Sequence, residues 1–277
     1  MITVEDMTDK SGADRGLYRL RDWLRLRCGM DYPDHKILLL KSRLQSLSDR
    51  LRLRGLDHLA ELALADANSQ AAALVVQVAS TNHTFFYREV DVLEVITSQI
   101  LLELRSRDDI RIWSAAASSG EEAYTVAIML AEALGLEAAR RRIAILGTDI
   151  SAHVVAEAER GVYAHSKLEN VDHALLQKYF KPVAPGQLGV SRDIKALCTF
   201  RRLNLKARPW PFRRPFDVVL CRNVLYYFER PDQIATLEAM YEATAPHGWL
   251  MTSVTETLRS LGTPWSQVSP GIYRRGA

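Results

Sequence analysis

The sequence contains few cysteines, no metal-binding histidine pattern and no long apolar run. Its three cysteines, Cys28, Cys198 and Cys221, are widely spaced and odd in number, which favours free thiols over a disulfide framework or a zinc site. The seven histidines show no ligand spacing, so we expect no bound metal. No apolar stretch has membrane-spanning length, and the chain does not open on a basic segment followed by an apolar one. We therefore expect a cytoplasmic protein that does not insert into a membrane.

An excess of charge of one sign is also missing. The 277 residues include 36 Lys and Arg against 33 Asp and Glu, a net charge of +3, and 48% of the residues are apolar. This composition is typical of a globular protein with a sizeable core, and the length exceeds one average domain.

Glycine-rich phosphate loops are absent, although one stretch has the outline of a nucleotide-binding unit. Residues Ile110–Ser114 read as a buried strand, and Glu121–Leu134 carry apolar residues at helical spacing, with small residues between them. Only Gly120 in this turn is a glycine, so neither G-x-G-x-x-G nor a P-loop is present. The acids Glu121 and Glu122 would repel a phosphate but suit a ligand that offers a cation, such as S-adenosylmethionine (SAM). Alternatively, they only complement the helix dipole.

The first part of the chain, residues 1–81, shows helical spacing and predicts a small all-α domain. Helices are predicted at 17–27, 34–54, 56–64 and 70–78. The second helix has an apolar face made of Ile37, Leu40, Leu44, Leu47 and Leu51.

A row of basic residues borders that apolar face, and we call it the basic stripe: Lys36, Arg43, Arg50 and Arg54. From Lys36 to Arg54 the only acid is Asp49, so the local field is positive. Such a stripe is often just a solvated helix face. If it has a partner, that partner is acidic, either a carboxylate-rich protein helix or nucleic acid. The aromatic residues and wider basic surface typical of nucleic-acid binding are missing, so we expect no nucleic acid.

The remainder of the chain alternates strands and helices, which predicts an α/β fold with a doubly wound sheet. Strands are predicted at 110–114, 142–147, 198–203, 216–222, 249–253 and 272–274. Asp149 follows the second strand, where it would either bind ribose hydroxyls or cap the helix that begins near Ala152. Asn223 follows the fourth strand, at the end where ligands bind in open α/β sheets. Residues of about 165–197 are turn-rich and predict an inserted small β-subdomain.

Four motifs, taken together and in their order along the chain, resemble the CheR-type chemotaxis receptor methyltransferases. They are the Asn-x-Thr-x-aromatic-aromatic-Arg string at 82–88, Trp-Ser-Ala-Ala-Ala-Ser-Ser-Gly-Glu-Glu-Ala-Tyr at 113–124, Thr-Asp-Ile at 148–150 and Cys-Arg-Asn-Val-Leu-Tyr-Tyr-Phe at 221–228. The resemblance implies a SAM-dependent protein-glutamate O-methyltransferase that modifies cytoplasmic helices of chemoreceptors and releases S-adenosylhomocysteine. It also implies a helical domain over 1–81 and a Rossmann-like SAM-binding domain over 82–277. We expect a monomer.

The same resemblance assigns roles to individual positions. The implied cofactor contacts are Asn82, Thr84, Arg88, Glu122, Asp149, Asn204, Leu205, Asn223 and Val224. Arg88 and Tyr227 are the implied catalytic residues, and the basic stripe is the implied receptor-binding face. The sequence departs from the family pattern at Tyr87, at Ala123 and at Ser253–Glu256, but no matched cofactor contact is lost.

Two other functions are alternatives, although the second would require a disrupted cofactor site, which the sequence does not show. One is a SAM-dependent methyltransferase of another protein or a small molecule, and the other is a non-catalytic SAM-binding adaptor. Some family members bind a receptor's C-terminal pentapeptide as an added strand on the β-subdomain. Pro182 and Pro185 lack the N–H groups that such pairing requires, so we expect no pentapeptide binding here.

Overall fold

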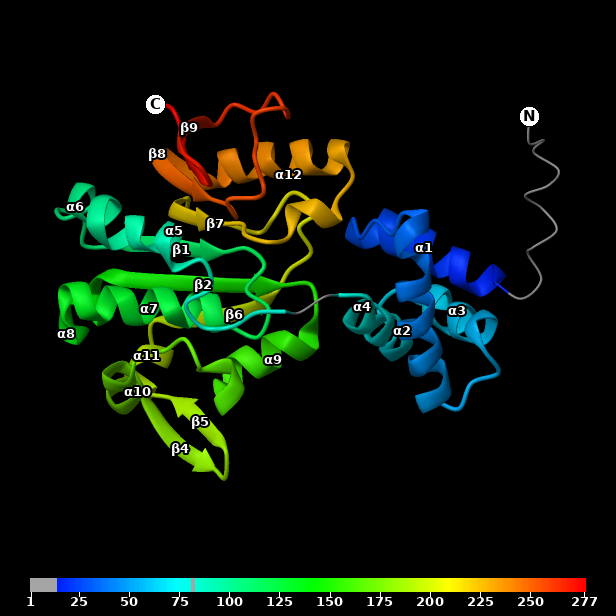
Figure 1. Cartoon of the computed structure of the whole chain (residues 1–277). Helices are drawn as coiled ribbons and strands as arrows, with labels where there is room; N and C mark the ends of the chain where they lie inside the picture. Colours follow the sequence, from blue (N-terminus) through cyan, green and yellow to red (C-terminus); the bar gives the residue numbers. More distant parts are fainter. Residues whose placement is uncertain (1–13, 81–82) are drawn as a thin grey trace. The chain divides into compact units, whose positions relative to one another are not determined.

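The computed structural model describes residues 14–80 and 83–277. The chain divides into two compact units (Figure 1). The helical unit comprises Met1–Thr81 together with Tyr227–Glu229, and the sheet unit comprises Asn82–Tyr226 and Arg230–Ala277.

The helical unit confirms the predicted small all-α domain. Its helices are α1 (Arg15–Cys28), the short turn η2 (Asp34–Lys36), α2 (Ile37–Arg50), α3 (Leu56–Ala65) and α4 (Gln70–Ala79). Gly29 ends α1 in the left-handed conformation, and the Ser69 side chain caps α4 by accepting a hydrogen bond from the Ala72 N–H. Leucines from α1, α2 and α3 fill the core, including the fully buried Leu24 and Leu44.

Helix α2 is shorter than the sequence pattern predicts. After Pro33 the chain makes the separate turn η2, and α2 ends at Arg50 because Arg52, with φ of 56°, turns the backbone out of the helix. Two residues of the basic stripe, Lys36 and Arg54, therefore flank α2 rather than lie on it. Leu51, which the sequence pattern places on the apolar face, is 38% exposed.

The sheet unit is built on a seven-stranded sheet of order β6-β2-β1-β7-β8-β10-β9, which confirms the predicted doubly wound α/β class. Its strands are β1 (Ile110–Ser114), β2 (Ile143–Asp149), β6 (Cys198–Arg202), β7 (Phe216–Leu220), β8 (Thr244–Met251), β9 (Ser266–Ser269) and β10 (Ile272–Arg274). The strands from β6 to β8 are parallel, whereas β10 pairs antiparallel with both of its neighbours.

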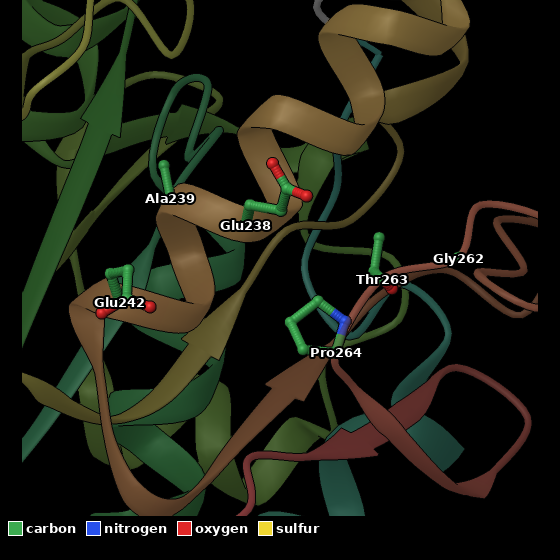
Figure 2. A pocket seen from close by; sticks show the side chains of 6 residues that line it. All are labelled: Glu238, Ala239, Glu242, Gly262, Thr263 and Pro264. Carbon is green, nitrogen blue, oxygen red and sulfur yellow. The ribbon is translucent and has the colours of Figure 1, made fainter.

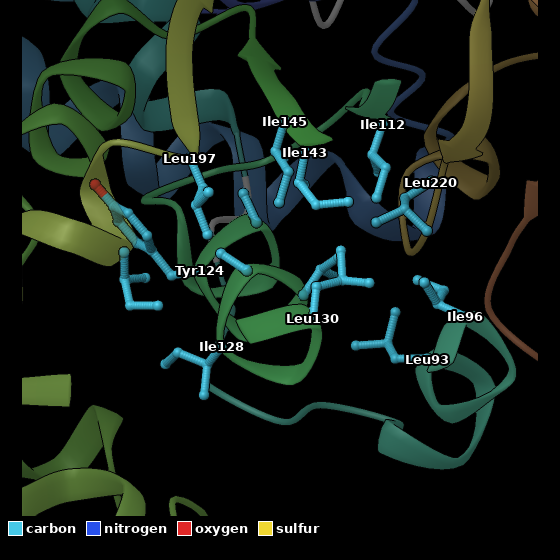
Figure 3. Packing of buried hydrophobic residues seen from close by; sticks show 14 of the residues in the cluster. Leu93, Ile96, Ile112, Tyr124, Ile128, Leu130, Ile143, Ile145, Leu197 and Leu220 are labelled. Atoms are coloured by element: carbon cyan, nitrogen blue, oxygen red, sulfur yellow. The ribbon is translucent and has the colours of Figure 1, made fainter. Parts of the chain in front are cut away.

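Helices cover both faces of this sheet (Figure 1). They are α5 (Val90–Val95), the π-helical turn η3 (Ile96–Ile100), α6 (Leu101–Glu103), α7 (Glu121–Leu134), α8 (Leu136–Arg142), α9 (Ala152–Arg160) and α12 (Arg230–Ala243). In Figure 3, Leu93 and Leu130 from α5 and α7 pack toward Ile112 and Leu220 of the sheet. On Trp113 the rings of Trp210 and Phe212 pack edge-on, with centroids 4.9 and 4.8 Å away.

The predicted inserted β-subdomain is a three-stranded sheet of order β3-β5-β4. Its elements are β3 (Val162–Ala164), η4 (His165–Lys167), α10 (His173–Tyr179), β4 (Phe180–Ala184), β5 (Gln187–Val190) and α11 (Arg192–Lys195). Strand β3 precedes residue 165, where the sequence pattern places the start of the insert. Three residues are too few to show an alternating pattern, so β3 is defined only by its pairing with β5.

No single helix within residues 14–80 and 83–277 is long and apolar enough to cross a membrane. Helices α3 and α4 reach that length only as a pair, and the chain bends by 118° between them.

Candidate cofactor site

The predicted site residues of the sheet unit gather around the carboxyl ends of β1, β2 and β7. Strand β1 pairs with β2 on one side and β7 on the other, so the strand order reverses beside β1. Ligands bind at such a switch point in open α/β sheets. The loop after β1 is tied to both neighbours, because the Ala115 N–H donates to Leu220 O and the Ala117 N–H donates to Thr148 O, each at 2.8 Å.

Small residues are required in this loop. Ser118 and Gly120 have φ of 48° and 97°, and a Cβ at Gly120 would lie 2.8 Å from the Ala158 Cβ. The Tyr163 hydroxyl donates to Ser119 O at 2.6 Å, so β3 of the insert braces the loop. The Ser118 hydroxyl oxygen is buried and has no hydrogen-bond partner among the described residues. A polar atom of this kind is suited to a ligand.

Asp149 is buried at the end of β2. Its two carboxylate oxygens accept hydrogen bonds from the Ser118 N–H at 3.0 Å and the Ser151 N–H at 2.9 Å. Burial raises the pKa of Asp149, although these backbone hydrogen bonds act against the shift. The N-cap residue of α9 is Ser151, so this bond reaches the residue that begins the helix and not an N–H group of its first turn. The remaining lone pairs on its oxygens can still accept donors from a ligand.

Glu122, on the first turn of α7, is held from two sides. The Ser114 hydroxyl donates to one carboxylate oxygen at 2.7 Å, and the Arg222 guanidinium donates to the other at 2.9 Å. The Arg222 side chain is only 2% exposed. This ion pair links the end of β7 to the start of α7 across the switch point.

The segment that leads to Arg88 adopts an unusual backbone. Tyr87 and Glu89, on either side of Arg88, have positive φ of 60° and 48°. The Arg88 guanidinium donates to His83 O at 2.6 Å and lies 5.9 Å from the Phe85 ring centroid. Phe86 anchors the segment, since it is fully buried.

Thr84 and its neighbours are bonded to the insert through Lys167. The Lys167 ammonium donates to Thr84 O at 2.7 Å and lies 3.0 Å from a carboxylate oxygen of Glu121, which is fully buried. The structure thus connects the insert to both the Thr84 segment and the loop after β1. Helix α5 begins after Glu89 without a side-chain cap, and Asn82 lies outside the described residues.

Two carboxylates hold Asn223 after β7. Its N–H donates to Glu256 at 2.7 Å, and its side-chain amide donates to Glu89 at 3.1 Å. Glu256 also accepts a hydrogen bond from the Leu225 N–H at 2.8 Å, so one buried carboxylate shapes the turn that contains Val224. Burial raises the pKa of Glu256, and backbone N–H groups oppose this rise.

Other predicted residues lie at the margins of this cluster. The Leu203 N–H donates to Asp149 O at 2.8 Å, so Asn204 and the buried Leu205 follow β6 beside the end of β2. Asn204 uses its side-chain oxygen to accept from the Lys206 N–H. Tyr227 groups with the helical unit, where its carbonyl accepts from the Asp31 N–H at 2.8 Å.

The four residues of the basic stripe lie in the helical unit and differ in their exposure to solvent. Lys36, Arg50 and Arg54 are exposed. The half-buried Arg43 instead donates to Ala79 O at 3.0 Å, at the carboxyl end of α4. Arg43 therefore has a structural partner that the sequence pattern did not reveal.

Sequence reasoning missed four charged residues that organise the cluster: Glu89, Lys167, Arg222 and Glu256. Arg222 and Glu89 stand beside predicted residues in the motifs at 221–228 and 82–88, and this adjacency was the only signal. Glu256 ends the Ser253–Glu256 departure from the family pattern, whereas Lys167 becomes visible only when distant segments are brought together.

A pocket of about 540 Å³ is lined by Glu238, Ala239, Glu242, Gly262, Thr263 and Pro264 (Figure 2). None of the predicted cofactor residues lines it. Among the described residues, no group of three or more His, Cys, Asp or Glu side chains could hold a metal ion, and the three cysteines are free.

Comparison with known proteins identifies the family. The model of the CheR methyltransferase SAM-binding domain matches residues 82–272. A chemotaxis protein methyltransferase of Borreliella burgdorferi is 32% identical over 89% of both chains, and one of Klebsiella aerogenes is 32% identical over 95% of this chain and 88% of its own. Chemotaxis protein methyltransferase 2 of Pseudomonas aeruginosa is 34% identical over 83% of this chain and 82% of its own.

The solved structure of the DszA carbon methyltransferase is a more distant likeness, 17% identical, with a TM-score of 0.41 over 91% of this chain and 64% of that chain. The family model and the curated relatives each cover most of the sheet unit, including the predicted loop after β1. The chain belongs to the CheR methyltransferase family and is a SAM-dependent chemotaxis protein methyltransferase.

Proposed function

We propose that this enzyme methylates glutamate side chains on the cytoplasmic helices of chemoreceptors and forms glutamyl methyl esters for sensory adaptation. The observation that carries the proposal is the extent of the match to relatives named chemotaxis protein methyltransferases, which spans 89% and 95% of this chain for two of them. The proposal includes a cytoplasmic location, action as a monomer, and functional domains over 1–81 and 82–277, with an insert of about 165–197.

The residues of the cluster fit SAM by their chemistry. SAM carries two cationic groups, and the cluster contains two carboxylates, those of Glu122 and Glu89. Both carboxylates pair with the Arg222 guanidinium. Asp149 and the unpartnered Ser118 hydroxyl supply hydrogen-bonding capacity that the protein leaves unused. We assign cofactor binding to Asn82, Thr84, Arg88, Glu122, Asp149, Asn204, Leu205, Asn223 and Val224.

Methyl transfer to a glutamate needs little acid–base chemistry. Bound SAM supplies an electrophilic methyl group on its sulfonium, and a glutamate side chain with a reference pKa of about 4.3 is already an anion at neutral pH. The protein therefore has to align the carboxylate and exclude water from it. We assign this task to the Arg88 guanidinium, which attracts a carboxylate, and to the Tyr227 hydroxyl, which can donate a hydrogen bond.

The helical unit supplies the proposed receptor contact. Lys36, Arg50 and Arg54 are exposed cations, and exposed leucines lie beside them on the same unit, including Leu38 at 75% exposure. An acidic, amphipathic receptor helix would match both features.

The direct test is incubation with radiolabelled SAM and receptor-containing membranes, followed by treatment with base. Release of volatile labelled methanol identifies a methyl ester and supports the proposal. Base-stable label on another protein or a small molecule would favour a different substrate. SAM binding without any transfer would favour an adaptor.

Arg88→Ala is the matching variant in the same assay. It should reduce methyl transfer by at least about 100-fold, because alignment of reacting groups contributes strongly to the rate, while the unfolding temperature stays close to that of the wild type. A normal rate would remove Arg88 from the mechanism.

A further inference from the structure

Arg222 joins three segments that carry the proposed cofactor residues. One terminal nitrogen of its guanidinium donates to Glu122 at 2.9 Å. The other donates to Arg88 O at 2.6 Å and Glu89 O at 3.3 Å, and lies 3.5 Å from a Glu89 carboxylate oxygen. All of these partners lie in the sheet unit.

The backbone that Arg222 contacts is strained. Tyr87 and Glu89 are not glycines, yet both have φ in the left-handed region, which is costly for residues with a Cβ. Such a conformation persists only when surrounding contacts hold it. The carbonyls of Arg88 and Glu89 converge on Arg222, and the Tyr87 N–H donates to the Thr125 hydroxyl at 3.1 Å.

The Glu89 side chain completes the same arrangement. Burial acts to raise its pKa, but hydrogen bonds from Asn223 and Ser253 and the charge of Arg222 together lower it. Glu89 therefore stays ionised and binds Asn223 and Ser253 while it pairs with Arg222. The turn over 87–89 is thus fixed from its carbonyls and from a side chain.

We propose that Arg222 is a positioning residue that imposes the backbone turn at 87–89 and thereby sets where the Arg88 and Glu122 side chains stand for methyl transfer. This inference deepens the proposed function and rests on it for the role of Arg88. Arg222 itself does not have to touch the cofactor or the substrate.

Only arginine suits this position. Its planar guanidinium presents donors in two directions, so one group satisfies the Glu122 carboxylate and the two carbonyls together. A lysine has a single nitrogen on a flexible stem and cannot reach both sides with the same geometry. With a side chain 2% exposed, a poorly paired cation would also be costly.

The test compares Arg222→Lys with Arg142→Lys. Arg142 is a matched control, because its guanidinium also donates to backbone carbonyls, those of Leu104, Arg105 and Arg107, at 2.8 to 3.1 Å. The first readout is amide hydrogen exchange of residues 84–92 in the cofactor-free protein, which reports on the turn whether or not the substrate has been identified. The second readout is the split between kcat and KM for SAM.

We expect Arg222→Lys to speed exchange in residues 84–92 by about 10-fold or more and to lower kcat/KM by about 10- to 100-fold, since small misplacements of aligned groups are costly. Arg142→Lys should leave both quantities within about twofold. Glu89→Gln keeps the shape of the side chain but removes one ion pair with Arg222, so exchange and kcat/KM should change by an intermediate amount. This variant replaces Arg222→Lys in the test if Arg222→Lys does not fold.

Unchanged exchange in residues 84–92 for a folded Arg222→Lys protein would overturn the proposal, as would equal losses in Arg142→Lys. If Arg222→Lys does not fold, unchanged exchange and kcat/KM in Glu89→Gln would overturn it too. Failure of the receptor assay with altered exchange in Arg222→Lys would instead count against the substrate and leave the positioning role supported.

Discussion

The carboxylate of Asp149 has more hydrogen-bonding capacity than the backbone uses. An ionised carboxylate has about four lone-pair sites, and the Ser118 and Ser151 N–H groups each occupy one on a separate oxygen. Bracing of the loop and binding of ribose are therefore compatible roles for this side chain. A measurement of affinity and stability in the same variant separates them.

Asp149→Ala should weaken binding of SAM and S-adenosylhomocysteine by roughly 1–3 kcal/mol, because charge-assisted hydrogen bonds to the ribose are lost. Isothermal titration calorimetry measures this directly. Asp149→Asn is the companion variant, since it keeps the size of the side chain. Unchanged affinity in a variant whose unfolding temperature has fallen would reduce Asp149 to a structural role.

The raised pKa of Asp149 also predicts how cofactor binding depends on pH. Burial makes this carboxyl protonate at a higher pH than an exposed aspartate would. Because the ionised form is the better acceptor for ribose hydroxyls, affinity should fall on acidification before exposed aspartates titrate. Titrations with S-adenosylhomocysteine at a series of pH values test this, and the fall should be flattened in Asp149→Asn.

The pKa shifts of the buried carboxyl groups also determine how the stability of the fold depends on pH. A carboxyl whose pKa is raised on folding stabilises the protonated folded state, and this stabilisation is lost as the pH rises through the folded pKa. Protonation of Asp149 and Glu256 therefore does not drive acid unfolding. Glu89, whose pKa is lowered, contributes stability that disappears as the pH falls through its folded pKa.

The hydroxyl group of Tyr87 is not stabilised by hydrogen bonds from its surroundings. The oxygen is buried, and no hydrogen-bond partner for it exists among the described residues. Burial also raises the pKa of this side chain, so it stays neutral. The position is one of the departures from the family pattern.

Tyr87→Phe should therefore be neutral or stabilising, by up to about 1 kcal/mol, because an unsatisfied polar group is removed. Tyr163→Phe provides the contrast, since it deletes the bond to Ser119 O and should cost about 1 kcal/mol. Urea unfolding of the two variants measures both changes in the free energy of unfolding. A large loss of stability in Tyr87→Phe would reveal a partner for its hydroxyl.

Among the elements of the fold, the inserted β-subdomain has two features. It holds the loop after β1 in place, and its strand β4 lies at an edge of the three-stranded sheet. Strand β5 lies between β3 and β4, so β4 has one unpaired edge in the three-stranded sheet. Pro182 lies within β4, opposite Leu188, and proline cannot donate a backbone hydrogen bond. Pro185 follows immediately in the turn.

We expect this edge not to accept a receptor C-terminal pentapeptide, because strand addition depends on backbone donors. Titration of the protein with such peptides should show no measurable binding while receptor methylation proceeds. Binding with a Kd in the low micromolar range, about −8 kcal/mol, would contradict the expectation.

At the scale of the whole molecule, the exposed cations of the basic stripe predict a salt-sensitive receptor interaction. Charge reversal at Arg50 and Arg54 should raise the apparent KM for receptor by about 3- to 10-fold and leave SAM affinity unchanged. Wild-type activity should fall with added salt, since exposed charges are screened over about 8 Å at physiological ionic strength. Steady-state kinetics over a range of salt concentrations test both expectations.

Arg141→Glu is the matched control, because Arg141 is an exposed arginine in the sheet unit, with a side chain that is 70% exposed. Substitution of Arg43 is unsuitable for this purpose, since its guanidinium donates to Ala79 O and loss of this hydrogen bond would cost about 1 kcal/mol of stability. Methylation that is indifferent to salt and to charge reversal would exclude this face as the receptor contact.

Much of the fold follows from local patterns in the sequence. The bounds predicted for β1 and α7 agree with the structure, because a buried strand, a small-residue turn and an apolar helix each leave a periodic signal. Short elements such as β3 and β9 were not predicted, since a few residues show no period and depend on pairing with a distant strand.

The class of the protein, the loop after β1 and the family motifs could be predicted from the sequence, because they depend on residues close together in the chain. The pairing of the charged groups, in contrast, follows from the assembled fold. Arg222 meets Glu122 and the carbonyl of Arg88 across separations of 100 and 134 residues, and Glu256 reaches Asn223 across 33. Such contacts form because buried charges must find partners when the strands assemble, and no local spacing records which partner each will have.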